Sequence, residues 1–120
     1  MKIYISYFAK IKNIPDDIIP IAICVKSPDW YKGKQFKTLA PTYDILMQYK
    51  QFGDTELYTQ RFYSEVLNKL NALEIYEHLE TLSKGKDVVL ICYEKSSDFC
   101  HRHLVADWLS KELNINVEEL

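Results

Sequence analysis

The spacing of apolar residues predicts strands at both ends of the chain and helices in its middle. Residues 2–8 alternate between apolar and polar, whereas residues 18–25 and 87–93 form continuous apolar runs, as in strands covered on both faces. Pro20 interrupts the run over residues 18–25, so we expect that strand to begin after it. Residues 116–118 are expected to form one further short strand.

Helical spacing fills most of the middle of the chain. Thr42 is a suitable N-cap for a helix over residues 43–51. Two apolar stripes at helical spacing then meet near Asn71, and their members are Phe62, Val66, Leu67 and Leu70, followed by Leu73, Tyr76, Leu79 and Leu82. Gly85 is expected to end the second of these helices, and residues 99–113 are expected to form the last one.

The order of these elements predicts the fold class. Strands that precede and follow a helical middle, with a last helix before a last strand, are typical of an α/β domain. We expect a single domain over residues 1–120, with a mostly parallel sheet of about three to four strands and helices on both faces. Residues 27–41 are expected to form a loop of about fifteen residues, a length that favours a functional role.

Composition narrows the class of protein. The 120 residues are 48% hydrophobic and 27% charged, an ordinary balance for a globular protein with its own core. The formal net charge of -2 argues against nucleic-acid binding that works mainly by phosphate neutralisation. Three cysteines, an odd number, do not suggest a secreted disulfide framework. Since we also expect neither a signal peptide nor a membrane span, the prediction is a cytoplasmic protein without a membrane partner.

Residue types used in binding and catalysis gather between Cys92 and Arg102, where the last long strand leads into the last helix. In α/β proteins, ligands bind most often in the crevice at the carboxyl ends of strands. The apolar arc of this helix contains Val105, Trp108 and Leu109. His101 and Arg102 fall at the edges of this arc and should point toward the sheet, whereas His103 falls on the opposite side, in solvent.

The start of this helix is expected to bind an anion. Ser97 or Asp98 can cap it, which would leave the free N–H groups of the first turn beside Cys100 and His101. Arg102 adds a fixed positive charge and a planar set of donors that suit phosphate or carboxylate.

The same residues have candidate catalytic roles. Glu94 and His101 are candidate acid–base groups, and Cys100 is a candidate nucleophile because a helix N-terminus favours the thiolate. Purely structural interpretations stay open beside these roles. They are Cys92 and Cys100 as packed thiols, His101 as an interior histidine bonded to a backbone carbonyl, and Arg102 as the ion-pair partner of Glu94.

Spacing argues against two specific kinds of site. Suitable zinc-ligand types occur at Cys92, Cys100, His101 and His103, but there is no C-x-x-C pair, so we expect no metal and no cofactor. A cysteine-dependent phosphatase loop needs an arginine six positions after its cysteine. Counted from Cys92, that position holds Asp98, and the loop lacks glycines.

Residues 27–41 offer a second group of candidate binding residues. Trp30 and Tyr31 are interleaved with lysines that include Lys37, a combination that can stack a base and hold a phosphate. Arg61, in the helical middle, is a candidate second anion ligand. A structural role for these residues is equally open. In that case the aromatic rings cover the core, and the charged side chains are exposed to solvent without binding a ligand.

The candidate site resembles that of the domain-of-unknown-function family numbered 488. In that family a strand ends in a cysteine and a glutamate, and Cys-His-Arg opens a helix after a short polar loop; the corresponding residues here are Cys92, Glu94, Cys100, His101 and Arg102. The compact bacterial and phage members are similar over nearly the whole chain, including the Trp30 loop, Leu39-Ala40-Pro41 and the tyrosine-rich segment 58–67. The resemblance implies a small α/β domain and no particular activity. One departure is Ser96-Ser97, where many members have a proline or glycine.

Three functions stay open from the sequence. The first is an enzyme acting on a nucleotide, nucleobase or other phosphate-bearing substrate, with Cys100, Glu94 and His101 as catalytic groups and Arg102 as anion ligand. The second is a non-catalytic module that binds a small anionic ligand or a nucleic-acid end, and the third is a regulatory interaction protein. The expected partner is a small anionic or nucleotide-like ligand, with nucleic acid less favoured.

Overall fold

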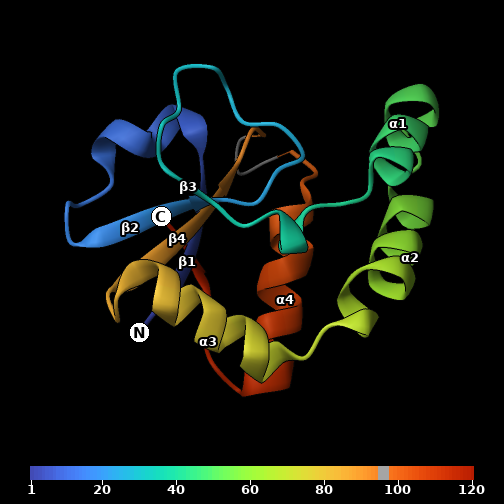
Figure 1. Cartoon of the computed structure of the whole chain (residues 1–120). Coiled ribbons are helices and arrows are strands. Elements are labelled where there is room, and N and C mark those ends of the chain that lie inside the picture. The colour runs from blue at the N-terminus through green and yellow to red at the C-terminus, as the bar shows by residue number, and fades with distance from the viewer. Residues whose placement is uncertain (95–97) are drawn as a thin grey trace.

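All five strands in the described part of the chain are parallel and belong to one sheet, in the order β3-β2-β4-β1-β5. The computed structural model describes residues 1–94 and 98–120 (Figure 1). The strands are β1 (Ile3–Tyr7), β2 (Ile18–Ala22), β3 (Lys34–Gln35), β4 (Asp87–Cys92) and β5 (Glu118–Glu119). The predicted α/β class with a parallel sheet is confirmed, although the sheet has more strands than expected.

One additional strand comes from the segment expected to be a loop. Within residues 27–41, β3 pairs in parallel with β2, and a 3-10 helix, η2 (Lys37–Leu39), follows it. A two-residue strand and a single helical turn leave no periodic pattern in the sequence, so spacing alone could not reveal them.

β2 begins before Pro20, and the prediction that it begins after this residue is wrong. Pro20 pairs with Val89 of β4. Its carbonyl oxygen accepts the Tyr31 hydroxyl at 3.3 Å, and the same hydroxyl reaches the Lys34 carbonyl of β3, so Pro20 directs its backbone polar atoms toward the β3 side. Because β3 pairs only from Ile21 onward, the missing N–H of Pro20 removes no ladder hydrogen bond.

The described residues form four α-helices in the predicted order: α1 (Tyr43–Phe52), α2 (Thr55–Glu65), α3 (Ala72–Ser83) and α4 (His101–Leu113). Thr42 caps α1 as predicted, its Oγ1 accepting the backbone N–H of Ile45 at 3.2 Å. The C-cap of α3 is Lys84, in the left-handed conformation with φ 56°, rather than Gly85. Among the described helices, none is both long and apolar enough to cross a membrane.

α4 begins two residues later than predicted, at His101. Its N-cap is Cys100, whose side chain makes no capping hydrogen bond. The expectation that Asp98 caps the helix is therefore wrong, and Ser97, the other expected cap, lies outside the described residues.

The sheet separates two apolar layers. Val88 and Leu90 of β4 face the layer formed by α2, α3 and α4. Val89 and Ile91 point to the opposite face, which the 3-10 helix η1 (Phe8–Asn13) covers. Successive strand residues point to opposite faces, so the continuous apolar run of β4 follows from burial on both sides. Helices cover both faces as expected, with the α-helices α2, α3 and α4 sharing one of them.

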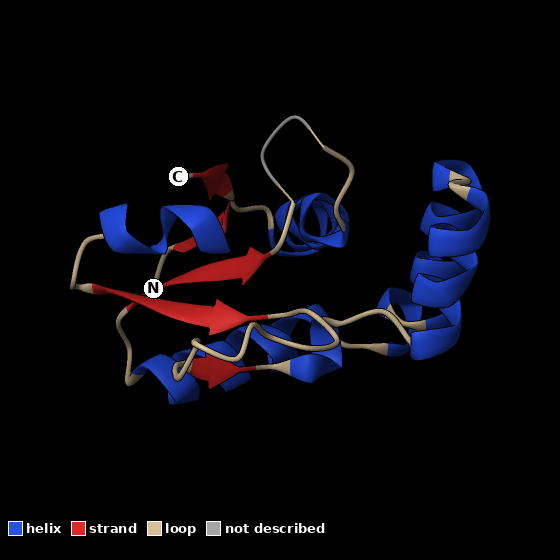
Figure 2. Ribbon diagram, turned by 90° about the horizontal axis from the view of Figure 1, so that it is seen from above, coloured by secondary structure: helices blue, strands red, loops and turns tan. Residues whose placement is uncertain are grey.

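α1 and α2 form a hairpin that projects beside the sheet (Figures 1 and 2). Gly53, with φ 67°, ends α1, and Asp54 caps α2. The rings of Tyr49 and Tyr58 contact each other and the ring of Phe99, which lies two residues before the start of α4. The hairpin is thereby held beside the start of α4, which places α1 opposite the carboxyl ends of β2 and β4.

Candidate functional site

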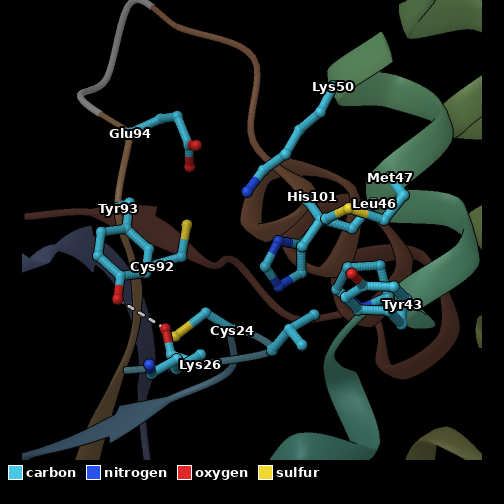
Figure 3. A pocket seen from close by; sticks show the side chains of 12 residues that line it. Cys24, Lys26, Tyr43, Leu46, Met47, Lys50, Cys92, Tyr93, Glu94 and His101 are labelled. Atoms are coloured by element: carbon cyan, nitrogen blue, oxygen red, sulfur yellow. Dashed lines mark hydrogen bonds between the residues drawn. The ribbon is translucent and has the colours of Figure 1, made fainter. Parts of the chain in front are cut away.

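A pocket of about 460 Å³ lies between α1 and the carboxyl ends of β2 and β4 (Figure 3). Its walls come from α1, from the segment after β2, from the end of β4 and from the first residue of α4. The location is the crevice at which α/β sheets hold ligands, and the volume is in the range of small-molecule sites.

One wall of the pocket belongs to α1. Ile45 is the buried residue of this helix and anchors it to the core. Tyr43, Leu46 and Met47 line the pocket from the same helix. Lys50 directs its ammonium group into the pocket, toward His101 (Figure 3). α1 therefore offers the pocket an apolar surface with one positive charge.

The opposite wall is the chain that leaves β4. Cys92 ends the strand, and Tyr93 and Glu94 follow it at the exposed rim. The Tyr93 hydroxyl donates to the backbone carbonyl of Lys26 at 2.6 Å, which ties this chain to the segment after β2 (Figure 3). The Glu94 carboxylate points into the pocket and makes no hydrogen bond or ion pair within residues 1–94 and 98–120.

His101 is buried at the inner end of the pocket. Its Nε2 lies 2.6 Å from the carbonyl oxygen of Ile23. Because a carbonyl oxygen only accepts, Nε2 carries the proton, and Nδ1 is the unprotonated nitrogen, 3.8 Å from Cys100 Sγ. Burial lowers the pKa of His101 to about 4, the bond to Ile23 opposes this shift, and the charge of Arg102 adds to it. The ring is therefore neutral near pH 7.

Cys92 and Cys100 are joined by a disulfide, with their sulfurs 2.18 Å and their Cα atoms 7.6 Å apart. Both are buried, and of the two, Cys92 lines the pocket. Cys100, the candidate nucleophile, has no thiol in this state. The free cysteine, Cys24, is buried and also lines the pocket, and burial raises the pKa of its thiol. The pocket therefore contains one protonated thiol near pH 7.

Arg102 is fully buried behind the pocket, not inside it. Its Nη1 donates to Cys92 Sγ at 3.2 Å and to the backbone carbonyl of Glu94. Its Nη2 pairs with the Glu119 carboxylate at 2.9 Å, and its guanidinium lies over the Tyr7 ring. Arg102 thus fixes the end of β4 and connects it to β5. The structural alternative of an ion pair between Arg102 and the Glu94 carboxylate is not observed, because the partners of Arg102 are the backbone carbonyl of Glu94 and the carboxylate of Glu119.

The remaining predicted binding residues do not line this pocket. Trp30 is exposed and packs edge-on against a ring of η1, and Tyr31 is buried with its hydroxyl on the backbone of β3. Lys37 is exposed in η2, and Arg61 forms ion pairs with carboxylates of α1 and α2. His103, expected in solvent, is half-buried, and burial lowers its pKa.

The α1 wall is the part of the pocket that sequence reasoning missed. Tyr43, Leu46 and Met47 recur at the spacing of an apolar helix face, which usually means core packing. The sequence did contain one signal, Lys50, which is seven positions after Tyr43 and therefore on the same helix face. A helix face that packs on a core would have an apolar residue at that position.

Comparison with known proteins assigns the chain to a family. No curated protein and no solved structure matches it significantly. Residues 12–113 match the family model DUF488-N3a, described as the active DUF488-N3 subclade, and this range includes every residue that lines the pocket. The chain therefore belongs to the DUF488 family, as its Cys-His-Arg motif indicated.

Proposed function

We propose that the protein is an enzyme whose pocket binds a small, phosphate-bearing ligand of nucleotide type, with Glu94 as its acid–base group. The observation that carries this proposal is that Lys50 and Glu94 enter the same pocket from opposite walls (Figure 3). One wall offers a cation for an anionic group, and the other offers a carboxylate with no protein partner among the described residues.

The anionic part of the ligand is proposed to lie against α1. Lys50 directs its charge inward, and Lys26 lines the pocket from the segment after β2. Lysine holds phosphate as a point charge. These two lysines take the place that the sequence suggested for Arg102, whose guanidinium is already engaged with Glu119.

The rest of the ligand is proposed to be flat and apolar. The pocket offers the rings of Tyr43 and Tyr93 and the aliphatic side chains of Leu46 and Met47. Aromatic rings stack nucleobases without requiring one particular base. A volume of about 460 Å³ is also adequate for a mononucleotide-sized molecule.

Catalysis is supported by two observations. The matching family model is described as an active subclade. Glu94 can exchange protons with a bound ligand, since its carboxylate points into the pocket. His101 is neutral and bonded to Ile23, so its proposed part is to shape the pocket, and a nucleophilic role for Cys100 remains a prediction for the reduced protein alone.

A binding module without chemistry is the second candidate. Two observations favour it: Cys100 is held in a disulfide, and His101 is hydrogen-bonded to the Ile23 carbonyl. Glu94 is then the single proposed acid–base group.

Binding is tested by calorimetry with AMP, adenosine and inorganic phosphate. We expect AMP to bind more tightly than adenosine or phosphate alone, and Lys50→Met to weaken AMP binding about tenfold, the loss of one modest charge contact. Lys111→Met is the matched control, because Lys111 lies in the last turn of α4, at the opposite end of that helix from the pocket. Equal effects of the two substitutions, or no binding of AMP at millimolar concentration, would refute the proposal.

Catalysis is tested by screening nucleotides for conversion by mass spectrometry. With a converted substrate, Glu94→Gln should abolish turnover and keep binding, since glutamine has the same shape without the proton-transfer group. Full turnover by Glu94→Gln would remove Glu94 from the chemistry. Binding of AMP without conversion of any nucleotide in the screen would favour the binding module.

A further inference from the structure

The strand-to-helix junction brings together three side chains of the kind that bind transition metals. The sulfurs of Cys92 and Cys100 and a ring nitrogen of His101 all lie within 4.8 Å of one another, and all three residues are buried. Cys92 comes from the end of β4, whereas Cys100 and His101 come from the start of α4. Two thiolates and an imidazole are a ligand set suited to zinc.

The orientation of His101 is the one that metal-binding histidines adopt. Its Nε2–H is directed at the Ile23 carbonyl oxygen, at 2.6 Å. Metal-ligating histidines usually donate their second ring nitrogen to such an acceptor, which fixes the tautomer and the plane of the ring. The lone pair of Nδ1 is left on the side of Cys100 Sγ, 3.8 Å away.

The charges around the cluster suit two thiolates. Arg102 is fully buried and donates from Nη1 to Cys92 Sγ at 3.2 Å. Two thiolates and one divalent cation compensate each other, and the hydrogen bond from Arg102 stabilises the sulfur that it contacts. The charges of the two thiolates and the zinc ion cancel, and Arg102 is already paired with Glu119, so zinc binding leaves no unbalanced charge in the buried cluster.

The ligand distances agree with a tetrahedral site once the sulfur–sulfur bond is broken. With sulfur at about 2.3 Å and nitrogen at about 2.0 Å from zinc, tetrahedral angles place a sulfur and a nitrogen about 3.5 Å apart and two sulfurs about 3.8 Å apart. The distance of 3.8 Å between His101 Nδ1 and Cys100 Sγ is close to the nitrogen–sulfur value. The two sulfurs would have to separate, and Cα atoms 7.6 Å apart leave room for that separation.

We propose that the reduced protein binds one zinc ion through Cys92, Cys100 and His101, and that the disulfide is the metal-free, oxidised state of the same site. A dithiol reductant supplies two electrons and two protons to the Cys92–Cys100 bond and becomes a disulfide itself. Zinc then displaces the two thiol protons. Because Cys92 and His101 line the pocket, the fourth coordination position opens into it. Zinc binding by these three residues does not require the phosphate-bearing ligand proposed for the pocket.

Sequence spacing argued against zinc because the two cysteines are eight positions apart and do not form a C-x-x-C pair. In the fold, the start of α4 lies next to the end of β4. Cys92 at the end of the strand is therefore close to Cys100 and His101 at the start of the helix.

The first test needs no substitution. Wild-type protein is stripped with a chelator, and one half is kept reduced while the other is oxidised with diamide. Both halves are then incubated with zinc, desalted and analysed for metal. We expect about one equivalent in the reduced protein and less than about a tenth in the oxidised protein, because a filled site needs both thiolates. Less than a tenth of an equivalent in the reduced protein, or equal retention in both halves, would overturn the proposal.

The second test identifies the ligands. Cobalt is added to the reduced protein, and the sulfur-to-cobalt charge-transfer absorption is recorded. Cys92→Ser and Cys100→Ser should each reduce this absorption by about half, since each removes one of two thiolates. His101→Gln, whose amide can still donate to Ile23, should weaken cobalt binding at least about tenfold. Circular dichroism checks that each variant is folded.

Cys24→Ser is the matched control, because Cys24 is a buried cysteine that lines the same pocket but lies outside the three-ligand cluster. It should keep the full cobalt spectrum and affinity. A Cys24→Ser protein that loses the spectrum, or a folded His101→Gln protein with unchanged affinity, would refute the assigned ligand set.

Discussion

Arg102 Nη1 lies 3.2 Å from Cys92 Sγ, so a fully buried cation sits directly behind the end of the central strand. Its ion pair with Glu119 and its bond to the Glu94 backbone make Arg102 the connection between β4, β5 and the pocket rim.

Arg102→Ala should destabilise the protein by about 3–5 kcal/mol, because it removes a buried charge and leaves its hydrogen-bond partners unsatisfied. Arg61→Ala is the matched control, because Arg61 forms its ion pairs, with Asp44 and Glu65, at the surface, and it should change stability far less. Urea unfolding of the oxidised proteins measures both. Similar losses for the two arginines would contradict a structural role specific to Arg102.

Tyr31→Phe should alter the response of stability to alkaline pH. Burial raises the pKa of Tyr31 to about 12. Above pH 10 the unfolded chain releases this proton while the folded protein keeps it, so stability is lost between about pH 10 and pH 12, by on the order of 2 kcal/mol. The phenylalanine variant lacks this loss. At neutral pH it should be less stable by about 1 kcal/mol, because the hydrogen bond to Lys34 is gone.

The measurement is urea unfolding of both proteins at intervals from pH 7 to pH 12. The stability advantage of the wild type should shrink as the pH rises through this window and then reverse. A constant difference between the two proteins at every pH would contradict the raised pKa.

Gly33→Ala should destabilise the protein through Tyr31. A Cβ atom at position 33 would lie 2.5 Å from the Tyr31 hydroxyl oxygen, which is fixed by its bond to β3. We expect a loss of about 1–3 kcal/mol from this overpacking. In a Tyr31→Leu background the obstructing atoms are absent, so the same substitution should have little effect. If the stability losses of Gly33→Ala and Tyr31→Leu were additive in the double variant, the Tyr31 ring would not be the cause of the Gly33→Ala effect.

Thr42→Ala and Asn71→Ala should separate stability from ligand binding. Each removes an N-cap, of α1 and of α3 respectively, and should lower stability by about 1 kcal/mol. Of these two helices, α1 lines the pocket and α3 does not, so only Thr42→Ala should weaken the binding of AMP measured by calorimetry. Weaker AMP binding by Asn71→Ala would contradict the assignment of α1, rather than α3, as a wall of the AMP-binding pocket.

The longer helices and strands could be predicted from the sequence because each has its own local pattern of apolar residues or caps. β4 is a continuous apolar run and is covered on both faces, and the Thr42 cap marks the start of α1. Pro20 misled the prediction of β2 because its tolerance depends on how far the neighbouring strand β3 extends, which local sequence does not encode.

The candidate site could be predicted only where it is local. The inward positions of His101 and Arg102 followed from helical geometry, and both side chains are buried. The ion pair of Arg102 could not be predicted, because its partner Glu119 lies on another strand, β5. The α1 wall could not be predicted either, because it depends on how the α1–α2 hairpin packs beside the sheet. The proximity of Cys92 and Cys100 depends on the path of the chain between them, so spacing alone did not indicate it.

The division of α1 between its single core residue, Ile45, and its pocket residues has an evolutionary consequence. Substitutions at Tyr43, Met47 or Lys50 change the pocket surface without removing a residue from the buried core. New ligand preferences can therefore arise in this helix by substitution at a few positions, without any change to the sheet or to the Cys-His-Arg junction.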